Sequence, residues 1–284
     1  MGSHHHQHAS AAETDADMAE LLDLDAEVMH AYLSEVTAWI RRLAADPPPG
    51  RILDLGSGTG TGAFALLERF EAADVIALDV SAEMLHRLSR QARTLGVADR
   101  IRTVQADLDT AWPAIDAVDL VWASRSLHHM ADPDRVLAGV FATLRPGGLL
   151  LVAEIASFPR FLPDDLGLGR PGLEARCHAV LAERQAAELP HLGSDWGPRL
   201  SLAGFTVEAE RPFVIDLSSP LPAASGRYAQ VSLRRLRSGL DGRLSADDLA
   251  VLDTLVDSEG PDGVRQRGDL TVRAARTVWA ARRP

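Results

Sequence analysis

The chain has 284 residues, of which 46% are apolar and 24% are charged, so it can form one large α/β domain with additions or two small domains, and it is not wholly disordered. A formal net charge of -11 disfavours a nucleic-acid partner, because a polyanion is repelled over the whole surface. The single cysteine permits no intrachain disulfide, and no apolar run is long enough for a membrane span or typical of a signal peptide. We therefore expect a cytoplasmic protein that acts on a small molecule, without a nucleic-acid, membrane or metal partner. Its oligomeric state is not predicted.

The first 50 residues divide into a tail and a helix. Residues 1–16 begin with MGSHHHQHAS, so we expect a disordered or tag-like tail there. From about residue 25 to 45, apolar residues recur at steps of three and four, which is typical of an amphipathic helix. The prolines of PPPG at 47–50 cannot continue that helix, so a core domain is predicted to begin at Arg51.

Beyond Arg51, five short apolar runs alternate with helical patterns. These runs are RILDL, DVIALD, IRTVQ, VDLVWAS and LLLVAEIA. Ser81 and Asp132 precede two of the helical patterns and can cap them with a side-chain oxygen. The alternation predicts an α/β fold with a parallel, doubly wound sheet.

After Ile155 the alternation stops. Two irregular segments follow, separated by one strand pattern near 205–217, and the chain closes on another near 270–281. The first segment contains a helical pattern around 173–188, and the second contains one near 228–237 and one that Ser245 can cap.

The stretch DLGSGTG joins the first strand to the first helix. Gly56, Gly58 and Gly60 lack Cβ atoms, so the backbone can approach a ligand closely, and the helix N-terminus offers N–H groups. Asp79 ends the second strand, where its carboxylate can accept hydrogen bonds from both hydroxyls of a ribose. The loop also fits the dinucleotide pattern GxGxxA, so these residues leave S-adenosylmethionine and a dinucleotide open as ligands.

Four motifs together resemble the class I S-adenosylmethionine-dependent methyltransferases: DLGSGTG, VQADLD, DLVWASRSLHHM and LRPGG. The resemblance is close over residues 51–155 and loose over 205–281. It implies a Rossmann-like seven-stranded sheet of order 3-2-1-4-5-7-6, with the last strand antiparallel, and S-adenosyl-L-methionine as the cofactor.

The resemblance also implies roles for individual residues. Asp54 would help to hold the methionine ammonium group, while Asp107 would accept from the adenine amino group and Leu108 would lend its backbone N–H. The other implied cofactor-binding residues are Gly56, Ser57, Gly58, Gly60, Asp79, Val80, Met84, Ala123 and Ser124. Trp122 stands where the family usually has a smaller aliphatic residue, which predicts altered packing beneath the site.

In such a sheet, three segments fall at insertion points that can cover the site. They are 17–50, 156–200 and 218–266, and we expect them to form a substrate lid on a methyltransferase domain that spans 51–284.

Two histidines follow the fourth strand near the expected methyl group. A neutral imidazole can deprotonate a hydroxyl acceptor, so His128 and His129 are candidate catalytic bases, with His128 favoured. A role for either in positioning the loop stays open. Arg125 could bind an acidic substrate or pair with Asp132 or Asp134.

The sequence therefore predicts an enzyme that methylates a small molecule, with oxygen favoured as the acceptor atom and nitrogen or carbon as alternatives. Tyr32, on the apolar stripe of the N-terminal helix, is interpreted as a core residue. A non-catalytic S-adenosylmethionine-binding protein is the other hypothesis. An NAD(P)-dependent reductase is disfavoured, because the chain has no lysine for a catalytic Tyr-Lys pair.

Overall fold

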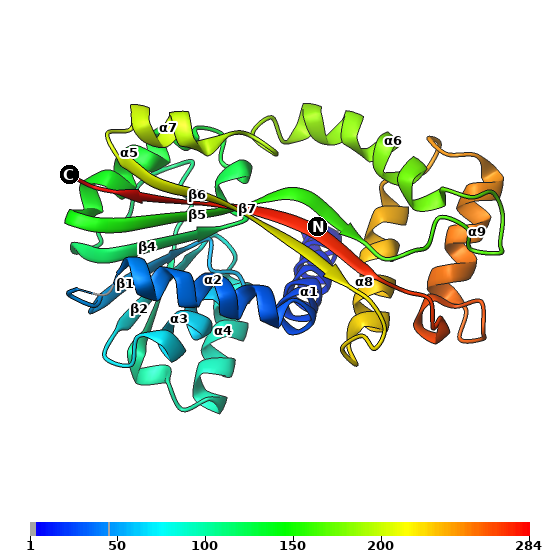
Figure 1. Ribbon diagram of the computed structural model, residues 1–284, viewed down its shortest axis with the longest axis horizontal. Helices are drawn as coiled ribbons and strands as arrows, with labels where there is room; N and C mark the ends of the chain where they lie inside the picture. The colour runs from blue at the N-terminus through cyan, green and yellow to red at the C-terminus, as the bar shows by residue number, and fades with distance from the viewer. Residues whose placement is uncertain (1–3, 45) are drawn as a thin grey trace.

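A seven-stranded sheet forms the centre of the molecule in the computed structural model, which describes residues 4–44 and 46–284. Its strand order is β3-β2-β1-β4-β5-β7-β6, and β7 runs antiparallel to both of its neighbours, which confirms the predicted topology (Figure 1). The strands are β1 (Arg51–Leu55), β2 (Asp74–Asp79), β3 (Ile101–Gln105), β4 (Val118–Ser124), β5 (Leu144–Arg160), β6 (Thr206–Leu217) and β7 (Val272–Arg282).

The helices begin where the sequence provides caps. Ser81 accepts from the Met84 N–H at 3.3 Å, Asp132 from Arg135 at 3.0 Å, and Ser245 from Asp248 at 3.2 Å. The helices are α1 (His4–Val28), α2 (His30–Leu43), α3 (Thr61–Arg69), α4 (Ala82–Thr94), α5 (Pro133–Thr143), α6 (Leu173–Glu188), α7 (Trp196–Leu202), α8 (Ser225–Ser238) and α9 (Ala246–Asp257), with short 3-10 helices η1 (Ala98–Arg100), η2 (Leu127–His129) and η3 (Val264–Gln266).

The central strands are apolar throughout because both faces of the sheet are covered. Successive residues of β1 point to opposite faces, so Ile52 packs with α2 and α3 while Leu53 packs with α5 and α7. This burial holds the carboxyl ends of the parallel strands in place.

The N-terminal region differs from the expected tail and single helix. Helix α1 begins at His4, so it includes most of the segment expected to be a tail. The helical structure is interrupted at Met29, and α2 begins at His30. Leu21, Leu24 and Val28 pack in an apolar core shared with α8, which holds the C-terminal part of α1 in place. Residues 1–3 of the expected tail lie outside the described residues.

A second lobe extends beyond the sheet. The ends of β5, β6 and β7 run past their neighbours and meet α6, α8 and α9 around a separate apolar core that includes Phe161, Tyr228 and Leu252 (Figure 1).

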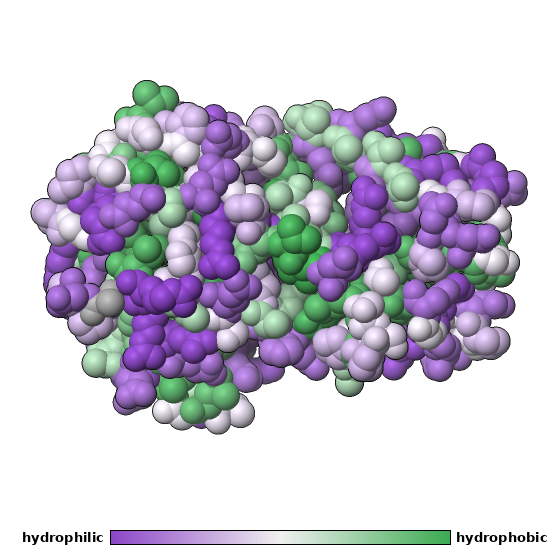
Figure 2. All heavy atoms as spheres, in the orientation of Figure 1, coloured by the Kyte–Doolittle hydropathy of each residue, from purple (hydrophilic) through white to green (hydrophobic). Residues whose placement is uncertain are grey.

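Apolar surface gathers near the middle of the face in Figure 2, and Val214 of β6 is 81% exposed. Within the described part of the chain, no helix combines the length and hydropathy that a membrane crossing requires.

Candidate active site

A cavity of about 530 Å³ lies at the carboxyl ends of β1, β2 and β4. The strand order reverses between β1 and β4, and α/β sheets bind ligands at such a switch point. Side chains from α1 and α2, which belong to the segment 17–50, line the cavity, and a lid role for this segment stays a prediction. No lining residue of the cavity comes from 156–200 or 218–266 among the described residues, so a lid formed by those two segments stays a prediction.

The glycine loop follows β1 directly and lines the cavity. Gly56 has φ +72°, and a Cβ there would lie 2.4 Å from the Ser126 Cβ. Gly58 has φ +51°, and a Cβ there would lie 3.0 Å from Leu22 of α1. Position 56 therefore requires glycine and position 58 favours it, and the loop leaves backbone N–H groups within reach of a ligand. Ser57 also lines the cavity, whereas Gly60 stands outside the lining and is the N-cap residue that precedes α3.

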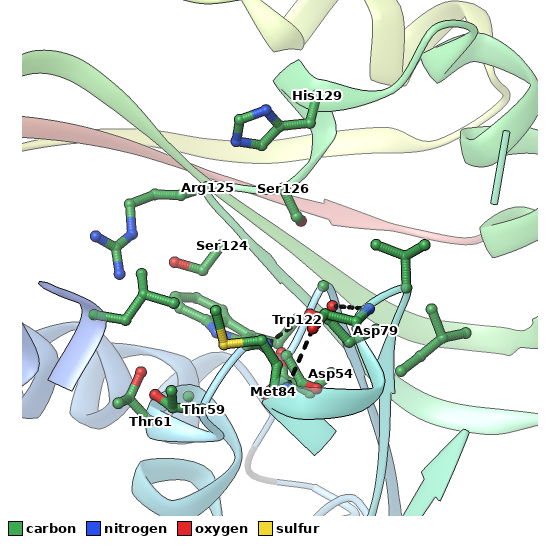
Figure 3. Close-up of a pocket in the computed structure, with 18 of the residues that line it drawn as sticks. Asp54, Thr59, Thr61, Asp79, Met84, Trp122, Ser124, Arg125, Ser126 and His129 are labelled. Atoms are coloured by element: carbon green, nitrogen blue, oxygen red, sulfur yellow. Dashed lines mark hydrogen bonds between the residues drawn. The ribbon is translucent and has the colours of Figure 1, made fainter. Parts of the chain in front are cut away.

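Asp79 lies at the carboxyl end of β2 and faces the cavity (Figure 3). Its Oδ2 accepts from the Gly58 N–H at 2.8 Å and its Oδ1 from the Ser81 N–H at 2.9 Å. Each carboxylate oxygen keeps a further lone pair, so the group is oriented by the backbone and can still accept from a ligand. Val80, which is 62% exposed, and Met84 line the same end of the cavity.

Asp54 has an unsatisfied acceptor deep in the cavity. The residue is 2% exposed, and its Oδ2 has no hydrogen-bond partner in the described structure. Burial raises its pKa to about 7, with a smaller contribution from Asp79, while the Ala63 N–H opposes the shift. A cationic hydrogen-bond donor would stabilise the ionised form of this carboxyl group, and the methionine ammonium of S-adenosylmethionine is such a donor. The Ser57 and Thr59 hydroxyls nearby are also buried without a partner.

Asp107 and Leu108 follow β3 and line the cavity, and their contact with an adenine ring stays a prediction. Asp107 accepts from the Asp109 N–H at 2.9 Å and from the Thr110 hydroxyl at 2.8 Å, and these bonds hold the pKa of its carboxyl below the usual value.

The end of β4 divides its side chains between the two faces. Ser124 and Trp122 line the cavity, but Ala123 points into the core on the opposite face, so its side chain is not part of the site. Trp122 packs against Gly62, where a Cβ would lie 2.5 Å from the indole Nε1. The large side chain that departs from the family pattern is thus accommodated by a glycine on α3.

The structure places His129, rather than the favoured His128, at the cavity. His128 is 4% exposed and stands outside the cavity lining, because its Nδ1 lies 2.5 Å from the Glu154 Oε2. His129 does line the cavity. Desolvation of the His129 ring and the neighbouring His128 lower its pKa to about 4. The preference for His128 as a base is therefore corrected in favour of His129.

Arg125 forms an ion pair that the sequence did not indicate. Its guanidinium lies 3.1 Å from the carboxylate of Asp25 on α1, rather than near Asp132 or Asp134. Asp25 is also 3.2 Å from Arg276 of β7 and accepts from the Tyr228 hydroxyl at 2.7 Å. Arg125 and Asp25 both line the cavity. One feature of the sequence could have indicated this ion pair: Asp25 is an acidic residue among the apolar residues at the end of α1.

Tyr32 is the other lining residue whose interpretation changes. Its ring packs edge-on against Phe213, as a core residue would, but its hydroxyl is buried at the cavity without a hydrogen-bond partner in the described structure. The Tyr32 ring therefore contributes to the core, while its hydroxyl can donate a hydrogen bond to a ligand in the cavity.

Comparisons with known proteins point in the same direction as this geometry. A family model described as a methyltransferase domain matches residues 52–148. The chain is 30% identical over 191 residues to the malonyl-[acyl-carrier protein] O-methyltransferase of Methylococcus capsulatus, covering 67% of this chain and 66% of that protein. It is 37% identical over 128 residues to the demethylmenaquinone methyltransferase of Thermus thermophilus, covering 43% and 56%.

A solved structure shares the fold. The crystal structure of a candidate methyltransferase from Bacillus halodurans superposes with a TM-score of 0.55 and 19% identity, covering 87% of this chain and 98% of that one. The aligned regions amount to 26%, 38% and 56% of the length of three curated relatives, so the chain spans less than two thirds of these proteins.

Proposed function

Because the chain contains a class I S-adenosylmethionine-dependent methyltransferase domain, we propose that it transfers the methyl group of S-adenosylmethionine to a small-molecule acceptor, with oxygen as the accepting atom. The observation that carries the proposal is the buried Asp54 Oδ2, which lacks a partner in the cavity beside the glycine loop. Asp79 supports it from the other end of the same cavity.

The residues of this chain would hold the cofactor at three points. Asp54 would bind the ammonium group, Asp79 the ribose hydroxyls, and Asp107 the adenine amino group. The bound cofactor supplies a methyl group that is already activated by a sulfonium centre. The protein therefore has to align the acceptor and exclude water, and Leu22 and Met29 line the cavity with apolar surface that serves this purpose.

A proton acceptor is available where the acceptor molecule would enter. His129 is uncharged at neutral pH, because its pKa lies near 4, and it faces the cavity. We assign it as the base for an acceptor that must lose a proton; a ring with this pKa is a weak base, so it suits an acceptor whose own proton is acidic. His128, held by Glu154, would position the η2 turn that carries His129.

The first experiment identifies the cofactor. We expect S-adenosylhomocysteine to bind the purified protein in calorimetry, and to bind an Asp79→Ala variant much more weakly. Tight binding of NADPH with no response to S-adenosylhomocysteine would contradict the proposal and favour a reductase.

The second experiment separates an enzyme from a non-catalytic binding protein. The protein is incubated with methyl-labelled S-adenosylmethionine and a cell extract depleted of macromolecules. We expect label in a small-molecule fraction. Bound donor without label in any acceptor would leave only the binding function.

A further inference from the structure

We propose that the acceptor is a carboxylic acid with an apolar body, and that Arg125 and Tyr32, supported by Asp25 and Arg276, bind its carboxylate. The inference rests on the proposed function and specifies the substrate class of the same cavity.

The backbone of Arg125 is held in a strained conformation. Its φ is +54°, and it is the one non-glycine residue with positive φ in the described part of the chain. Its N–H donates to the Ala153 carbonyl at 2.8 Å, which secures the turn after β4. Strain of this kind persists where the surrounding structure enforces it, and it occurs often at ligand sites. In Figure 3, Arg125 lies on the opposite side of the cavity from Asp79, with Ser124 between them.

Two arginines, Arg125 and Arg276, lie near two acids, Asp25 and Glu154. Two guanidinium groups, those of Arg125 and Arg276, share the single carboxylate of Asp25. The nearby acid Glu154 is engaged by the Leu127 N–H at 3.1 Å and by the His128 ring. Glu154 also attracts Arg125, so the two guanidinium groups have two carboxylates near them, of which Asp25 is the one in direct contact with Arg125 among the described residues. A carboxylate ligand would give the Arg125 guanidinium a second direct partner.

The donors that remain free belong to Arg125 and Tyr32. Arg276 directs its other contacts to the backbone carbonyls of Ser157 and Ala275, both at 3.2 Å. Asp25 is the side chain found against the Arg125 guanidinium among the described residues, so most of its N–H groups stay available. Burial raises the pKa of the Tyr32 hydroxyl to about 12, which keeps it protonated as a donor. A carboxylate can accept from a guanidinium and a hydroxyl together.

Apolar side chains line the same cavity. They include Met18 and Leu22 of α1, Met29, and Leu33 of α2. These side chains suit a hydrocarbon or aromatic body, and they provide little for a polar chain such as the methionine part of the cofactor. We therefore assign the carboxylate to the acceptor rather than to the cofactor.

The test is calorimetry on protein saturated with S-adenosylhomocysteine. The probes are octanoate and 3-phenylpropionate, each compared with its primary amide, which has the same shape without the charge. We expect at least one acid to bind about tenfold more tightly than its amide. Arg125→Gln and Tyr32→Phe should each remove most of this preference, while the affinity for S-adenosylhomocysteine stays unchanged.

Two controls keep the result interpretable. Arg145 lies outside the cavity lining, and its guanidinium is 2.5 Å from the Asp119 carboxylate. Arg145→Gln should change neither the affinity for the acids nor that for S-adenosylhomocysteine. Tyr32→Phe retains the packed ring, so it reports on the hydroxyl even if Arg125→Gln lowers the melting temperature.

Two results would overturn the inference while the proposed function stands. One is that neither acid binds more tightly than its amide to the loaded wild-type protein. The other is that both variants weaken S-adenosylhomocysteine but bind its decarboxylated analogue as well as the wild type does, because the cluster would then hold the cofactor carboxylate. A wild-type protein that fails to bind S-adenosylhomocysteine would refute the proposed function and this inference with it.

Discussion

The buried carboxylate of Asp54 provides a quantitative prediction for the protein without ligand. Burial raises its pKa from 3.8 to about 7, and at 1.36 kcal/mol per unit this corresponds to a cost of about 4 kcal/mol for keeping the ionised group in the folded state. Because the folded pKa lies above the unfolded value, the unfolded chain releases the proton first. The contribution of Asp54 to stability is therefore most favourable below pH 4 and is lost as the pH rises toward 7.

The substitution Asp54→Asn removes this titration with little change in shape, and its amide oxygen can still accept from the Ala63 N–H. The free energy of unfolding is measured by urea denaturation between pH 5 and pH 8 for both proteins. Relative to the variant, the wild type should lose about 3 kcal/mol over this range. Groups common to both proteins cancel in the difference, so the difference isolates Asp54.

Ligand binding should show the opposite trend. If the ammonium group of S-adenosylhomocysteine binds Asp54, the affinity of the wild type should rise between pH 5 and pH 8 as the carboxylate ionises, and that of Asp54→Asn should stay nearly flat. Parallel stability profiles for the two proteins, or an equal pH dependence of binding, would refute the reasoning.

Three further predictions concern neighbouring residues. Asp79→Ala should weaken S-adenosylhomocysteine about a hundredfold in calorimetry, because two charge-assisted hydrogen bonds to ribose are lost, and a change below about twofold would contradict this role. Gly62→Ala should lower the free energy of unfolding by about 1–3 kcal/mol through its clash with Trp122, and adding Trp122→Leu should restore much of it; an unaltered melting curve for Gly62→Ala would count against the clash. His129→Gln should lower kcat by at least about a hundredfold with little change in cofactor affinity, whereas Glu154→Gln should mainly reduce stability; equal kcat for His129→Gln and wild type would exclude a base at this position.

Local patterns in the sequence were sufficient for the main architecture. The alternation of strands and helices, the caps at Ser81, Asp132 and Ser245, and the family motifs predicted the sheet order, which the structure confirms. These features depend on residues close together in the chain, or on rules that connect consecutive elements. The proposed cofactor end of the cavity follows from them, since Asp54 and Asp79 lie at the carboxyl ends of neighbouring parallel strands.

Tertiary structure decided the acceptor end. Asp25, Arg125 and Arg276 come from α1, the turn after β4, and β7, and no spacing in the sequence brings a helix near residue 25 to a strand near residue 276. The choice of candidate base between His128 and His129 likewise depends on Glu154 of β5. Glu154 binds the buried His128 ring, and His129 lines the cavity. Local sequence therefore determined the strand ends at the proposed cofactor site. The long-range packing of α1 determined which charged side chains meet at the proposed acceptor site, because a buried charge takes its partner from whichever element folds against it.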